Sequence, residues 1–142
     1  MLEKYCICSM VDSRYAHSAL TEGVIGCAMQ VHRELGSGFP EAVYQRSLAV
    51  ELERAGLPFQ REVHRPVFYK DVEVGARPVD FLVADVVLVE LKATTELTDS
   101  HYAQTITYLK AFKLEVGLLI NFGQKSLQHK RFIKTLPTHK SV

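Results

Sequence analysis

The sequence contains nothing that predicts a membrane span or a secretory leader. No apolar run approaches the roughly 20 residues that a membrane-spanning helix needs. At the N-terminus, Glu3 and Lys4 precede only a short apolar patch, and no clear cleavage site follows. We therefore expect a cytoplasmic protein that makes no contact with a membrane.

Cysteine is scarce, and its pattern excludes a disulfide framework. The three cysteines, Cys6, Cys8 and Cys27, are odd in number, and a C-x-C pair alone is a poor signal for a metal. Free, reduced thiols are the expected state. Cys27 falls on an apolar helix face, and no Ser-His-Asp order is evident, so the sequence offers no covalent nucleophile.

Repeats and low-complexity linkers are also absent, which favours one domain. The 142 residues are 47% hydrophobic and 23% charged, as in a soluble globular protein with a real core. Residues 1–17 show no clear period, and we expect a loosely attached N-terminal segment there. Residues 18–136 should form a single domain, and residues 137–142 a tail.

Charge is distributed unevenly, although the net charge is only +1. From Lys110 onward a single acid, Glu115, accompanies seven basic residues, which are Lys110, Lys113, Lys125, Lys130, Arg131, Lys134 and Lys140. The remainder is net acidic. A basic end beside an acidic centre suits a phosphate backbone that approaches bound cations; a solvated basic tail is the alternative.

Apolar spacing predicts the order α-α-β-β-β-α-β-β, an α/β fold. The first helix should start at a Ser18 cap and stop at Gly36, and the third should have Thr98 as its N-cap. The valine-rich stretch 58–92 predicts an antiparallel meander of at least three strands. The remaining elements are a helix over 40–55, a strand buried on both faces over 115–122 and a last strand over 129–136.

The stretch RPVDFLVADVVLVELK carries Asp80, Glu90 and Lys92 among residues expected to be buried. Glu90 and Lys92 share a face because they lie two apart on one strand. Asp80 lies on the same face only if the loop has three residues, Ala84 to Val86, or if a bulge in either strand shifts the alternation of side chains by one residue. A two-residue loop would place Asp80 opposite Val89.

Two carboxylates on one face, about 5.5 Å apart, would repel each other unless a cation lies between them. Carboxylate oxygens with several waters suit Mg²⁺. Lys92 would then meet a phosphate or the water that attacks it. The alternative is a strand-edge pair of Glu90 and Lys92, with Asp80 capping a turn.

In order along the chain, several motifs resemble the PD-(D/E)xK nuclease superfamily. Within it the sequence is similar to the GxxExxY proteins, a small bacterial and archaeal branch, because GFPEAVY (residues 38–44) fits G-x-x-E-x-x-Y. Pro78-Val79-Asp80 departs by one residue between the proline and the acid. The other matching stretches are VHRELGSGFPEAVYQRSL, VDFLV, VELKA, HYAQTITYLK and VGLLINFG. The resemblance covers residues 20 to about 133 and implies a restriction-endonuclease-like α-β-β-β-α-β core, whose mixed sheet is flanked by helices.

Carried over by residue, the resemblance implies a metal site for Mg²⁺ or Mn²⁺ at Asp80 and Glu90, with Lys92 as catalytic lysine. The Leu91 carbonyl would be a further metal ligand. Glu41 resembles an extra acid that binds the metal directly or through water; a first-turn acid favoured by the helix dipole is the alternative. Gln104 resembles the Gln of a Q-x-x-x-Y pattern that orients water or phosphate.

Four further residues are candidates for substrate contacts. Tyr108 completes the Q-x-x-x-Y pattern, although a core role is the simpler expectation for it and for Tyr44. Three roles are open for His32, namely a ligand, a substrate contact or a buried polar residue, and the last two are favoured. Arg77 meets phosphate or a surface acid, and Lys110 belongs to the basic C-terminal third.

These residues and the resemblance together predict a metal-dependent nuclease that acts on DNA in preference to RNA, with homodimerisation open. A non-catalytic module that binds nucleic acid or protein is the alternative, and a hydrolase of a small phosphorylated compound is a third possibility.

Overall fold

The computed structural model describes residues 17–134, which form an α/β fold with the predicted order of elements. The predicted segments 1–17 and 137–142 lie almost wholly outside the described residues. The helices are α2 (Ser18–Leu35), α3 (Glu41–Arg54) and α4 (Asp99–Phe112). The strands are β1 (Phe59–Tyr69), β2 (Val72–Val83), β3 (Val87–Lys92), β4 (Val116–Asn121) and β5 (Gln128–Ile133).

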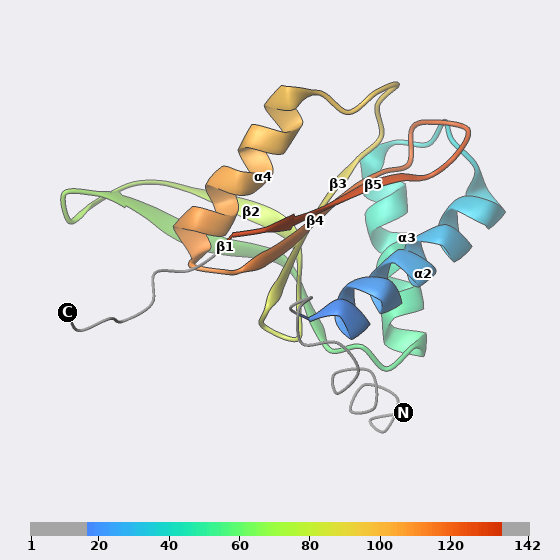
Figure 1. The fold of residues 1–142 in the computed structure, drawn as a ribbon, viewed down its shortest axis with the longest axis horizontal. Helices are drawn as coiled ribbons and strands as arrows, with labels where there is room; N and C mark the ends of the chain where they lie inside the picture. The colour runs from blue at the N-terminus through green and yellow to red at the C-terminus, as the bar shows by residue number, and fades with distance from the viewer. Residues whose placement is uncertain (1–16, 135–142) are drawn as a thin grey trace.

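The five strands form one mixed sheet in the order β1-β2-β3-β4-β5. Neighbouring strands are antiparallel except β3 and β4, which run parallel because α4 connects them by a crossover. Helices α2 and α3 cover one face of the sheet and α4 covers the other (Figure 1). The expected meander of β1, β2 and β3 is confirmed, and every residue of β4 is buried.

One hydrophobic cluster lies on each face of the sheet. Val87, Val89 and Leu91 of β3 pack with α2 and α3. Leu88 packs with α4 in the second cluster. Because side chains alternate along a strand, Glu90 and Lys92 belong to the α4 face with Leu88.

The helix ends agree with the sequence in part. Thr98 is the N-cap of α4: its hydroxyl accepts from the His101 N–H, and its own N–H donates to His101 Nδ1 at 3.1 Å. Ser18 is not the cap of α2. That position belongs to His17, in a left-handed conformation with φ of 55°, while the Ser18 carbonyl accepts from the Thr21 hydroxyl.

The distal part of the β1–β2 hairpin extends beyond the helical layers (left in Figure 1). Four large apolar side chains there are about 60% exposed, namely Phe68, Tyr69, Val72 and Val74. The edge strand β1 contains Pro66, which lacks an N–H, and its pairing with β2 shifts register between Val67 and Phe68. Such interruptions keep an edge strand from pairing with another chain.

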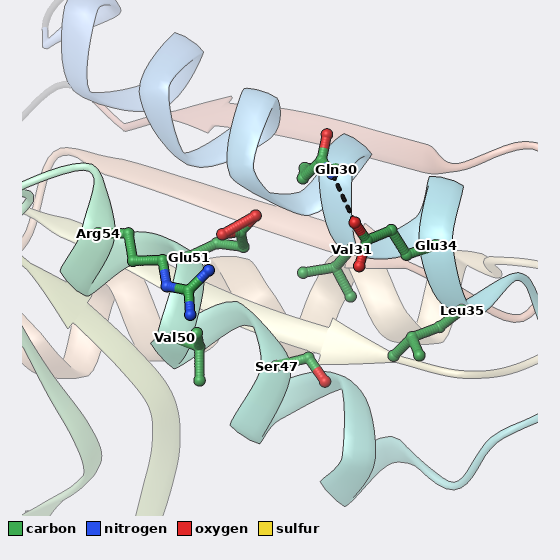
Figure 2. A pocket seen from close by; sticks show the side chains of 8 residues that line it. All are labelled: Gln30, Val31, Glu34, Leu35, Ser47, Val50, Glu51 and Arg54. Atoms are coloured by element: carbon green, nitrogen blue, oxygen red, sulfur yellow. Dashed lines mark hydrogen bonds between the residues drawn. The ribbon is translucent and has the colours of Figure 1, made fainter.

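A groove of about 310 Å³ lies between α2 and α3. Figure 2 shows it lined by side chains of both helices, with Gln30 donating to Glu34 at 3.1 Å. None of the predicted site residues lines it. Within residues 17–134, no helix combines the length and the apolar character that crossing a bilayer requires.

Candidate active site

The loop between β2 and β3 has three residues, which places Asp80 opposite Glu90. Val83 pairs with Val87 and Phe81 with Val89, so the next facing positions are Asp80 and Glu90. The left-handed residues are Ala84 (φ 51°) and Asp85 (φ 60°). Val86 therefore avoids the conformation that is costly for a β-branched residue.

The β2–β3 ladder stops at Phe81↔Val89, and side chains take over its hydrogen bonds. The Asp80 N–H donates to Glu90 Oε1 at 3.1 Å, and the Leu91 N–H donates to Asp80 Oδ2 at 2.8 Å. Each carboxylate thus accepts a backbone N–H of the facing strand. The strands separate at this point, and the two acids fill the gap side by side.

Asp80 also marks an irregularity on its other side. The pairing of β1 with β2 passes from Arg61↔Phe81 to Val63↔Val79, and Glu62 between them has φ of 53°. Val79 packs on the α4 side, whereas Phe81 packs on the α2–α3 side, although residues two apart normally share a face. This local twist turns the Asp80 side chain into the gap.

Gln45 of α3 binds Asp80, which the sequence analysis did not anticipate. Its Nε2 donates to Asp80 Oδ1 at 2.7 Å, so both Asp80 oxygens accept a hydrogen bond. Gln45 follows Glu41 by four residues, one turn along the same helix face. That spacing is the signal that would have found it.

Lys92 and Gln104 are brought together as the sequence predicted. Lys92 Nζ donates to Gln104 Oε1 at 3.2 Å, and both side chains are half-buried. Glu90, two residues before Lys92 on the same face, is only 2% exposed. Helix α4 therefore orients the lysine beside the acidic pair.

The Leu91 carbonyl also opens toward the gap. In a strand, the N–H and C=O of one residue point to the same neighbouring strand. The Leu91 N–H binds Asp80 on the β2 side, whereas the Lys92 carbonyl accepts from the Phe122 N–H on the β4 side. The carbonyl oxygen of Leu91 thus lies on the side of the two carboxylates.

This donor set fits a divalent cation of the Mg²⁺ type. Two carboxylates and one carbonyl are hard oxygen ligands, and Mg²⁺ keeps several waters besides the few protein groups that hold it. Among residues 17–134, no group of three or more His, Cys, Asp or Glu side chains is arranged to hold a metal. The protein thus offers an oxygen site with two acids rather than a closed cage.

Glu41 is exposed at the first position of α3, where a helix dipole favours an acid. The buried Tyr44 orders the loop that leads to it: its hydroxyl donates to the Gly36 carbonyl at 2.6 Å and accepts from the Phe39 N–H at 3.2 Å. Gly38 has φ of 113°, which favours glycine. These contacts explain the G-x-x-E-x-x-Y spacing, while a metal contact of Glu41 stays a prediction.

His32 is a buried polar residue of α2, one of its two favoured roles. Its Nε2 lies 2.8 Å from the Gln124 carbonyl and therefore donates to it. The Gln124 side chain in turn donates to the Thr95 carbonyl, just after β3. His32 thus supports the loops behind Lys92.

Asn121 is a second support that sequence reasoning missed. It is fully buried and pairs with Lys92 across the parallel ladder. Its amide accepts from the Thr94 and Gly123 N–H groups and donates to the Thr94 carbonyl and to Gln128 Oε1, at 2.9–3.0 Å. All of its hydrogen-bonding capacity is used to join the segment after Lys92 to β4 and β5.

The other predicted substrate contacts lie at varied places. Tyr108 is half-buried against the α4-side cluster, as expected for a core role, and Lys110 is exposed on α4. Arg77 lies on β2, opposite Arg65 of β1 in the backbone register. The structure therefore joins Asp80, Glu90, Leu91, Lys92 and Gln104 into one site, and leaves substrate contacts of His32, Arg77, Tyr108 and Lys110 as predictions.

Comparison with known proteins identifies the family of the chain. The sequence model described as PD-(D/E)XK nuclease superfamily matches residues 18–132, most of the chain. The chain belongs to the PD-(D/E)XK nuclease superfamily. A comparison with curated proteins finds no match.

Two solved structures share the fold. The protein titled SSO0001 has a TM-score of 0.55 at 16% identity; the alignment covers 68% of this chain and 52% of SSO0001, so this chain spans about half of that protein. An alkaline exonuclease, LHK-Exo from Laribacter hongkongensis, has a TM-score of 0.51 at 9% identity, over 85% of this chain and 72% of the exonuclease. At these identities the likeness shows the restriction-endonuclease-like fold alone.

Proposed function

We propose that this protein is a metal-dependent nuclease that hydrolyses phosphodiester bonds, preferentially in DNA. The observation that carries the proposal is the strand gap, where Asp80 and Glu90 lie side by side with the Leu91 carbonyl and Lys92. Phosphoryl transfer needs positive charge at the point where negative charge develops on the phosphate oxygens. Membership of the nuclease superfamily supports the same conclusion.

Asp80, Glu90 and the Leu91 carbonyl would hold Mg²⁺ or Mn²⁺, with Glu41 reaching it through water. A divalent ion there supplies charge that offsets the negative charge on the non-bridging oxygens. Lys92 donates to a phosphate oxygen or to the attacking water, since its ammonium has three donors. Gln104 Oε1 accepts one of them at 3.2 Å and so fixes the direction of the others.

The decisive experiment assays cleavage of single- and double-stranded DNA and RNA in Mg²⁺, Mn²⁺ and EDTA, with Lys92→Ala beside the wild type. We expect metal-supported cleavage that EDTA abolishes. Lys92→Ala should slow cleavage by about 100-fold or more and leave metal binding nearly intact, because a transition-state contact is lost. Lys125→Ala, which removes an exposed lysine from the β4–β5 connection, should cleave like the wild type.

The second candidate is a binding module on a nuclease fold. One observation favours it: the carboxylates already satisfy backbone N–H groups, so they have a structural role without any metal. Nucleic acid binding without cleavage in every metal, with wild type and Lys92→Ala indistinguishable, would establish this reading instead.

We further propose that the chain belongs to the GxxExxY branch of the superfamily and acts in the cytoplasm. The left-handed Gly38, Glu41 at the helix start and the two hydrogen bonds of the Tyr44 hydroxyl support the branch. Homodimerisation stays a prediction, to be checked by sedimentation velocity.

A further inference from the structure

The pairing of residues across the sheet shows which side chains of the edge strand β5 lie on the same face as Glu90. Glu90 pairs with Leu119 of β4, and Leu119 pairs with Lys130 of β5. Side chains that are paired in this way stand on the same face. Phe132, two residues beyond Lys130, packs with the α4-side cluster, which identifies that face. Lys130 therefore stands beside α4, two strands and about 10 Å from Glu90 at the backbone.

Helix α4 holds the Lys130 ammonium in place. Lys130 Nζ lies 5.8 Å from the centre of the Tyr102 ring, within the range of a cation–π contact. The Tyr102 ring lies against Phe132, with centroids 5.8 Å apart, and Tyr102 precedes Gln104 by two residues. Lys130 itself is exposed. The contact thus keeps an accessible positive charge beside α4, on the face of the sheet that carries Glu90 and Lys92.

The charges of β5 suit an anionic polymer. The strand contains Lys130 and Arg131 and no acid. Lys92 pairs with Asn121 of β4, and Asn121 pairs with Gln128 of β5. The Asn121 amide donates to Gln128 Oε1 at 2.9 Å, which fixes the polar side chain of Gln128 at the edge of the sheet. A small phosphodiester bound at the acids would not extend about 10 Å to Lys130, whereas a nucleic acid strand has further phosphates along its length.

We propose that Lys130, held by Tyr102, binds a backbone phosphate of a nucleic acid strand whose scissile phosphate lies at Asp80 and Glu90. The inference rests on the proposed function and extends it, because it makes the substrate a polymer that crosses the sheet from β3 to β5. The structure selects Lys130 from the seven basic residues that follow residue 109.

The test measures binding of a fluorescent single-stranded DNA oligonucleotide by anisotropy in EDTA, between about 50 and 200 mM salt. Lys130→Gln should weaken binding about 3- to 10-fold and lower the slope of log K against log salt by about 0.7, the contribution of one phosphate contact to a single strand. Tyr102→Leu retains bulk against Phe132 and should weaken binding about 2- to 5-fold. Lys113→Gln removes the same charge beyond the other end of α4 and should keep the full slope.

Cleavage then separates this inference from the proposed function. Lys130→Gln should lower kcat/KM for the oligonucleotide several-fold more than for bis(4-nitrophenyl) phosphate, whereas Lys92→Ala should impair both equally. If the wild type cleaves DNA and Lys130→Gln behaves like Lys113→Gln in binding, the phosphate contact is refuted. If nothing is cleaved but the salt slope falls only in Lys130→Gln, the contact stands and the nuclease proposal fails.

Discussion

Asp80 and Glu90 are structural members of the sheet as well as candidate ligands. Each carboxylate accepts a backbone N–H of the facing strand. Loss of an acceptor from a buried N–H costs about 1–3 kcal/mol. Changes at either acid should therefore affect stability as well as metal binding, and the two effects must be measured apart.

Metal binding should stabilise the folded protein through Asp80. Mg²⁺ or Mn²⁺ at 100 times its Kd should stabilise the native state by about 2.7 kcal/mol and raise Tm, because only the native state forms the site. Asp80→Asn should abolish this shift in a thermal melt. Asp85→Asn, in the exposed β2–β3 turn, should preserve it. A shift that survives in both Asp80→Asn and Glu90→Gln would place the ion elsewhere.

Gln45 should affect the metal without contacting it. Its hydrogen bond to Asp80 Oδ1 orients a candidate ligand, and loss of such supporting partners typically lowers metal affinity 10- to 100-fold. Gln45→Ala should weaken Mg²⁺ or Mn²⁺ binding by about 10-fold in calorimetric titration. Arg46→Ala, at the next and exposed position of α3, serves as the control. Equal affinities in the two variants would show that Gln45 does not position Asp80.

At the scale of elements, the loops behind Lys92 are packed backbone against backbone. A Cβ at Gly123 would overlap the backbone N and O of Thr94 and lie 2.6 Å from the Ala93 carbonyl carbon. Glycine is required there by this close approach rather than by its φ. The β4–β5 connection is thus packed closely against the segment that joins Lys92 to α4.

Two glycine substitutions should therefore have opposite effects on stability. Gly123→Ala should lower the free energy of unfolding by about 1–3 kcal/mol, because backbone atoms must move. Gly26→Ala in α2 meets nothing within 4 Å and should raise it by about 0.5–1 kcal/mol, the difference in helix propensity. Urea titration of both variants measures the contrast; a neutral Gly123→Ala would mean that the loop relaxes freely.

The elements were predictable from the sequence because their signals are local. Thr98 caps α4, and the valine-rich run forms the central strands as expected. The register was not predictable, since it depends on two residues, Ala84 and Asp85, that adopt left-handed conformations without glycine. Ser18 is not the cap because α2 begins one residue earlier than expected, with a left-handed His17 at the N-cap that no pattern indicates.

The site shows the same division. Asp80, Glu90, Lys92 and Gln104 were found because family spacing places them on one hairpin and the helix that follows. The contact from Gln45 to Asp80 spans 35 residues of sequence, and the one from Asn121 to Thr94 spans 27. Helical spacing can place Gln45 on the same face of α3 as Glu41, but the contacts themselves depend on how helices and strands pack.

At the scale of the molecule, burial is uneven, and so should be local stability. The distal β1–β2 hairpin exposes its apolar side chains, whereas β3 and β4 are almost completely buried. In native-state hydrogen exchange, amides of residues 67–74 should exchange through local opening, and those of β3 and β4 only on global unfolding. Equal protection in both regions would mean that another surface covers the hairpin.

The structural role of Asp80 and Glu90 also predicts which site residues would be lost first during evolution. Selection for a folded chain alone retains Asp80 and Glu90, because each satisfies a backbone N–H. Lys92 does not satisfy a backbone group in this way, because its ammonium donates to the side chain of Gln104. A lineage that abandons cleavage should thus lose the lysine first and keep both acids, and relatives with the acids but without the lysine should be binders rather than nucleases.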